Sequence, residues 1–164
     1  MKFLKNAVDK KRNFKEVDEI ELPVFELDEN MGIPESFIPD IEARLQIYQE
    51  MSLVYQISNL EDLKEIYEDR FGELPEPFLN LFKYQQIKIL AYKIGIKNLN
   101  LNEKNCVIKF DFEVFGLTNL IKKLIKYDIK IIGNNIRIFG GINIEELFDF
   151  LNKIFELKSN LIAN

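Results

Sequence analysis

Residues 59–75 constrain the fold of this chain most, because they combine a helical apolar pattern with a clear stop signal. The apolar positions that recur at helical spacing are Leu60, Leu63, Ile66, Tyr67 and Phe71. Ser58 and Glu61 stand three positions apart, as the two members of a capping box do. Gly72 followed by Pro75 predicts the end of the helix. The pattern therefore predicts a short helix with one face against a core.

The outward side of this predicted helix is almost entirely negative. Its acids are Glu61, Asp62, Glu65, Glu68 and Asp69, against the bases Lys64 and Arg70. Four of these carboxylates share one face, at positions i, i+4, i+7 and i+8: Glu61, Glu65, Glu68 and Asp69. These four are the candidate partner-binding residues, since such a face complements a basic protein surface. Spacing alone favours the plainer interpretation, a solvated helix surface.

Charge is divided unevenly along the chain, which carries −5 overall. Residues 16–76 hold eighteen acids and three bases, whereas residues 1–15 and 77–164 each carry a net charge of +5. A block as acidic as the middle one argues against contact with phosphates there. It favours a basic protein partner or a solvated face.

The residue types that are missing exclude several classes of site. The chain has no histidine, which removes the commonest general base and the usual zinc ligand. Its one cysteine, Cys106, cannot form an internal disulfide and reads as a small buried hydrophobe. No apolar run reaches the length of a membrane span. We expect no catalytic, cofactor-binding or metal-ligating residue on this chain, and a cytoplasmic location.

The order of predicted elements indicates an α+β single domain, with three N-terminal helices followed by two β-hairpins interleaved with helices. The predicted strands are 16–25, 96–101, 106–112, 129–132 and 136–139, and the predicted helices are 39–57, 59–71, 75–94, 117–127 and one that begins after Asn143. Pro23 points to an edge position for the first strand. Residues 1–16 are expected to be a linker from a preceding domain, and residues 17–164 the domain itself.

Several local signals accompany these elements. Asp40 and Arg44 have the spacing of an intrahelical ion pair. Gly95 is placed to end the third helix, and Asn143 with Glu146 forms a capping box for the last one. The helix at 39–57 is expected to turn one set of residues inward: Ile41, Leu45, Tyr48, Met51 and Tyr55.

Three blocks together are specific to a family. They are residues 33–48 (IPESFIPDIEARLQIY), 69–75 (DRFGELP) and 87–96 (IKILAYKIGI). In this order and spacing the chain resembles the C-terminal domain of bacterial transcription-repair coupling factor, over about residues 17–160. The first two blocks are the specific part, and the sheet half matches in outline.

The resemblance implies a role without catalysis. The parent family consists of ATP-driven DNA translocases of the helicase type, which remove stalled RNA polymerase from DNA damage and recruit nucleotide-excision repair through UvrA. The C-terminal domain of such a protein is a regulatory, autoinhibitory module. It docks on the N-terminal UvrB-like module, masks the UvrA-binding surface and restrains the motor. This chain has no phosphate-binding loop, so ATP and magnesium would belong to the motor domains of a longer protein.

The family's docking contacts run through the acidic helix that ends in the Asp-Arg-Phe-Gly motif. Asp69 matches this motif at its own position. The acid that often stands three residues earlier is Ile66 here, so Glu65 is the expected substitute. RNA polymerase and UvrA would be indirect partners, with no direct nucleic-acid or membrane contact.

Two other functions remain open at this point. The first is a nucleic-acid-binding accessory domain that uses the basic C-terminal half between Lys83 and Lys130. A lysine stripe on an amphipathic helix is, however, usually its solvated side: Lys122, Lys123 and Lys126. The second is a small hydrolase, which the lack of histidine disfavours.

Overall fold

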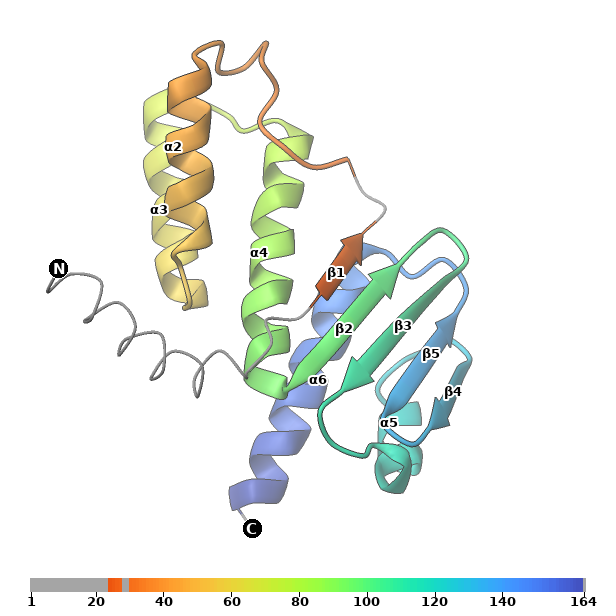
Figure 1. The fold of residues 1–164 in the computed structure, drawn as a ribbon. Coiled ribbons are helices and arrows are strands. Elements are labelled where there is room, and N and C mark those ends of the chain that lie inside the picture. Colours follow the sequence, from red (N-terminus) through yellow and green to blue (C-terminus); the bar gives the residue numbers. More distant parts are fainter. Residues whose placement is uncertain (1–23, 28–29, 164) are drawn as a thin grey trace, which may run out of the picture.

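The computed structural model describes residues 24–27 and 30–163, and we confine the structural account to these. Within them the chain forms an α+β single domain with helices first and strand hairpins after, as expected (Figure 1). The predicted linker 1–16 and most of the predicted first strand lie outside the described residues. What is described of that strand is β1 (Val24–Leu27).

A mixed sheet forms one layer of the described chain. Its five strands are β1, β2 (Ile96–Leu101), β3 (Asn105–Phe110), β4 (Ile129–Ile132) and β5 (Asn135–Phe139). Their order in the sheet is β1-β2-β3-β5-β4, with β1 parallel to β2 and the other pairs antiparallel. The first strand is therefore at an edge, as predicted. Both predicted hairpins, β2–β3 and β4–β5, are present.

Helices make up the rest of the fold. They are α2 (Ile41–Ser52), α3 (Ile57–Phe71), α4 (Glu76–Ile94), the 3-10 turn η1 (Phe115–Leu117), α5 (Thr118–Lys122) and α6 (Ile144–Ala163). Helices α4 and α6 pack together behind the sheet, while α2 and α3 stand beside the first half of α4 (Figure 1). Among residues 24–27 and 30–163, no helix covers the face of β3, β5 and β4 that looks away from α6 (Figure 1).

Two clusters of buried side chains hold this arrangement. The sheet core joins the inner face of the sheet to α6 and the second half of α4, with Ile136, Ile138 and Leu147 fully buried. The helical core joins α2 and α3 to the first half of α4, around Tyr67 and Phe78. Helix α4 therefore belongs to both cores.

The ends of two helices follow the sequence signals. Asn143 and Glu146 exchange the two bonds of a capping box: the amide of Glu146 donates to Asn143 Oδ1 over 2.8 Å, and the amide of Asn143 donates to Glu146 Oε2 over 3.1 Å. Gly95 ends α4 in the left-handed conformation (φ 94°), and its amide donates to the carbonyl of Ala91. Both sequence predictions are confirmed.

Helix α2 differs from expectation in length and orientation. It ends at Ser52, because the amides of Leu53 and Val54 turn back to the carbonyls of Glu50 and Met51. The residues that it buries are Ile47 and Met51, whereas Ile41, Leu45 and Tyr55 are 61%, 55% and 64% exposed. Only Met51 of the five expected inward residues is buried. Apolar residues lie on several sides of α2, so periodicity alone did not identify the buried side.

Three further local predictions are wrong. Helix α3 begins at Ile57 with Gln56 at its N-cap, so Ser58 lies inside the helix and forms no capping box. Asp40 caps α2 by accepting from the amide of Glu42, while Arg44 donates to the carbonyls of Ile38 and Pro39 in place of an Asp40 ion pair. The helix predicted at 117–127 stops at Lys122, because the chain then closes i→i−3 bonds.

Cys106 lies fully buried in β3, as its interpretation as a small hydrophobe requires. Burial raises the pKa of its thiol to about 12. A group whose pKa is raised on folding contributes stability that is complete below its unfolded pKa and is lost as the pH rises towards the folded pKa.

We expect this thiol to make stability fall with alkaline pH. Between pH 8 and pH 10 its contribution to the free energy of unfolding should decrease by about 1.4 kcal/mol, because the unfolded thiol ionises and the folded one does not. Urea unfolding at both pH values measures the decrease. Cys106→Ala should have a lower free energy of unfolding than the wild type at pH 8. Between pH 8 and pH 10 its free energy of unfolding should fall by correspondingly less than that of the wild type. An equal loss in both proteins would contradict the assignment.

Candidate protein-interaction surface

Helix α3 is anchored by one deeply buried aromatic residue. Tyr67 is 1% exposed, and its ring centroid lies 5.9 Å from that of Phe78 and 6.1 Å from that of Phe82. Leu60, two turns earlier, is fully buried on the same side. Aromatic pairs at these distances add to the free energy of apolar burial. The orientation of α3 about its own axis is therefore set by the helical core.

The hydroxyl of Tyr67 fixes this helix to its neighbour α2. It donates a hydrogen bond to Glu50 Oε2 over 2.5 Å. Burial and this bond to a carboxylate raise the pKa of Tyr67 well above its usual range. The tyrosine thus stays protonated, and keeps donating, throughout the physiological range.

With Tyr67 inward, the four candidate residues point to solvent. Glu61, Glu65, Glu68 and Asp69 are all exposed on α3, as the sequence predicted. We call these four residues the acidic face. Glu68 lies 3.7 Å from the ammonium group of Lys64, one turn earlier, in an exposed pair that screens it only weakly. Within the described residues, the other three carboxylates form no ion pair.

The charges on α3 are not placed to stabilise the helix itself. Its first turn carries no acid, although carboxylates are favourable at a helix N-terminus. Its last turn holds Glu68 and Asp69 beside the one base Arg70, where the helix dipole disfavours negative charge by about 0.3–1 kcal/mol for each group. Apart from the Lys64–Glu68 pair, these acids are therefore not placed where they would stabilise the helix.

Three apolar side chains of α2 and α3 that the sequence pattern placed inward are also exposed. Ile66, between Glu65 and Asp69 in the helical array, is 54% exposed. On α2, Ile41 and Leu45 form an exposed apolar strip one turn apart. Such residues add desolvation energy to a contact that charges alone would leave weak. The one sequence signal that position 66 is exposed was that the family often has an acid where this chain has Ile66.

Two kinds of site are not found in the described part of the chain. No group of three or more acidic or cysteine side chains there is placed to hold a metal ion. No described helix is long and apolar enough to cross a membrane.

Comparison with known proteins assigns a family to this fold. The family model described as the TRCF domain matches residues 27–115, more than half of the chain. A transcription-repair-coupling factor of Escherichia coli is 34% identical over 114 residues, which cover 67% of this chain and 10% of that protein. The protein of the same name from Buchnera aphidicola subsp. Acyrthosiphon pisum is 33% identical over 115 residues, covering 68% of this chain and 14% of its own length.

A solved structure matches the architecture. The crystal structure of a C-terminal domain of transcription-repair coupling factor superposes with a TM-score of 0.70, and covers 84% of this chain and 96% of that one. Identity between the two is 19%, so this likeness concerns the fold. The chain spans about a tenth of the length of the first of these curated relatives.

Proposed function

Since the chain belongs to the transcription-repair coupling factor family and has the fold of the C-terminal domain, we propose that it is a non-catalytic, autoinhibitory protein-interaction domain. Its partner would be the N-terminal UvrB-like module of the same parent protein. Docked there, the domain would mask the UvrA-binding surface and restrain an ATP-dependent DNA translocase. The parent would act in the cytoplasm, where transcription and nucleotide-excision repair take place.

The observation that carries this proposal is the acidic face. Three of its four carboxylates lack an ion pair among the described residues, and the helix beneath them is held rigidly by Tyr67. A fixed array of unpaired negative charges complements a basic patch and sets the orientation and rate of docking. The exposed Ile66 would be the apolar centre of the contact.

A surface of this kind suits a contact that must open. Each exposed ion pair contributes about 0.2–1 kcal/mol, so the whole latch would be weak compared with a large apolar interface. A coupling free energy of about 1–3 kcal/mol changes a second ligand's affinity roughly 5–150-fold. Engagement of RNA polymerase elsewhere on the parent could then release the domain and uncover the site for UvrA, without direct contact between polymerase and this domain.

Reversing charge on the acidic face tests the proposal. Glu65→Arg with Asp69→Arg in the parent protein should raise both UvrA binding and basal ATP turnover several-fold, because the latch opens. The isolated 164-residue chain carrying the same changes should unfold at the same urea concentration as the wild type, since both positions are exposed.

The matched control moves the same charge elsewhere. Glu103→Arg with Glu113→Arg alters two exposed acids outside α3 by the same total charge. This control should leave UvrA binding and ATP turnover unchanged. Equal effects of the two double variants, or no effect of the first on either assay, would refute the latch.

A further inference from the structure

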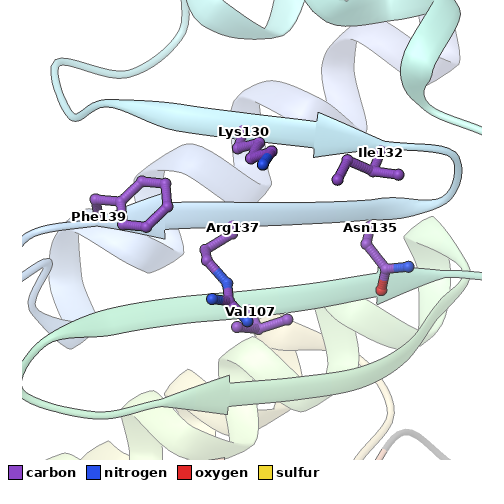
Figure 2. A pocket seen from close by; sticks show the side chains of 6 residues that line it. All are labelled: Val107, Lys130, Ile132, Asn135, Arg137 and Phe139. Carbon is purple, nitrogen blue, oxygen red and sulfur yellow. The ribbon is translucent and has the colours of Figure 1, made fainter.

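The uncovered side of the sheet is hollowed on β3, β5 and β4. The hollow measures about 460 Å³ and is lined by Val107, Lys130, Ile132, Asn135, Arg137 and Phe139. Figure 2 shows these side chains rising from the three strands on the side opposite the helices. We call this surface the open sheet face. It lies on a different part of the fold from the acidic face of α3 (Figure 1).

Two cations oppose each other directly on this face. Lys130 on β4 is in register with Arg137 on β5, and Arg137 is in turn opposite Val107 on β3. Like charges at opposed positions of neighbouring strands destabilise a sheet. Lys109, on the same side of β3 as Val107, adds a third positive charge.

Nothing in the described chain neutralises this group. Lys109, Lys130 and Arg137 form no ion pair among the described residues, and the three strands carry no acid on this side. The nearest acids along the chain stand just outside the strands: Asp111 directly follows β3, Asp128 directly precedes β4, and Glu103 lies in the turn before β3. None of them forms an ion pair with the three cations among the described residues. A polyanion placed over the hollow would relieve the repulsion that the sheet now bears.

The rest of the hollow favours bases and sugars over a simple anion. Phe139 is 42% exposed, and Arg137 offers a second flat group, and both kinds of side chain stack on nucleobases. The amide of Asn135 lies between the cations and the end of the strand pair (Figure 2). An acidic peptide would pair with the cations but would leave these flat groups without a matching partner.

We propose that the open sheet face binds single-stranded DNA, with its phosphates on Lys130, Arg137 and Lys109 and a base stacked on Phe139. The aliphatic wall of Val107 and Ile132 favours DNA over RNA, because it offers no partner to a 2′-hydroxyl and suits the methyl group of thymine. This site differs from the expectation that the domain contacts no nucleic acid, and it acts independently of the latch.

Fluorescence anisotropy of the 164-residue chain with a labelled fifteen-nucleotide oligo-dT tests the site. Lys130→Gln with Arg137→Gln should weaken binding at least about tenfold, and should make the slope of log K against log salt shallower by about 1.4, or 0.7 for each lost phosphate contact. Phe139→Ala should weaken binding about fivefold or more with an unchanged salt slope, because stacking is lost and charge is not.

The control removes the same charge at the C-terminal end of α5. Lys122→Gln with Lys123→Gln changes two exposed lysines outside the sheet and should leave the affinity within about twofold. Urea unfolding of the Lys130/Arg137 variant should match or exceed that of the wild type, since two opposed cations are gone. Equal losses in the two charge variants would overturn the proposal. So would tighter binding of oligo-U or duplex DNA than of oligo-dT, or displacement of oligo-dT by polyglutamate at equal charge concentration.

Discussion

Phe78→Ala is expected to lower the free energy of unfolding by about 3–5 kcal/mol, the range for deletion of a fully buried phenyl ring. Phe78 is completely buried at the start of α4. Its ring stacks on that of Phe82, with the ring centroids 5.4 Å apart. The centroids of the Tyr67 and Phe37 rings lie 5.9 Å and 6.2 Å from that of Phe78. These rings come from α4, α3 and the segment before α2, so they cannot all close over the space that the deletion leaves.

Urea unfolding followed by far-ultraviolet circular dichroism measures this loss. Phe115→Ala is the matched control, because Phe115 is 58% exposed and the same deletion there should change stability by less than about 0.5 kcal/mol. Similar losses in the two variants would mean that the aromatic cluster does not hold α2 and α3 to α4. The acidic face would then lack the rigid support that the latch requires.

Leu147→Ala is expected to lower the free energy of unfolding by about 2–5 kcal/mol, because it removes a fully buried side chain from the sheet core. Leu147 lies in the first turn of α6 and is fully buried in the sheet core. The loss should appear in the helical core as well, because α4 contributes Ile87, Leu90 and Ile94 to the sheet core and Phe78 and Phe82 to the helical core.

Two probes separate local from global loss in this variant. Near-ultraviolet tyrosine signals, recorded in a Tyr127→Phe background because Tyr127 packs against the sheet core, report on the helical core through the buried Tyr67. Far-ultraviolet circular dichroism reports on all helices. Both should shift to the same lower urea concentration. Leu53→Ala, at a position 72% exposed, should shift neither. If the tyrosine signal kept its wild-type midpoint, the two cores would be separate folding units.

Helices and strands could be predicted from the sequence wherever the apolar residues followed either helical or alternating spacing clearly. The strands Ile96–Leu101 and Ile129–Ile132 have their expected bounds, since alternation and flanking turn residues agree there. Gly95, Gly72 and the Asn143 capping box ended or began helices as expected, because their chemistry is local.

The errors arose where tertiary contacts decide. Helix α2 has apolar residues on more than one side, and burial of Ile47 against α3 and α4, which no local pattern records, turned Ile41 and Leu45 outward. The stop after Lys122 follows a chain path in which Tyr127 reaches Glu146 on α6, nineteen residues away.

The charged residues of the candidate site could be predicted from the sequence, but the exposed apolar residue beside them could not. The shared face of Glu61, Glu65, Glu68 and Asp69 follows from helical spacing alone, and their exposure agrees. The exposure of Ile66 depends on the angle at which Tyr67 seats α3, which is a property of the core. The opposition of Lys130 and Arg137 depends on strand register, which the hairpin turn at Gly133 sets.

Helix α4 contributes side chains to both cores, and this limits how the two parts of the domain can move relative to each other. A hinge between the α2–α3 part and the sheet would require the packing of one of the two cores to break. The described part of the chain is therefore expected to move as one rigid body. Any rotation that moves α3 would therefore carry the sheet through the same angle.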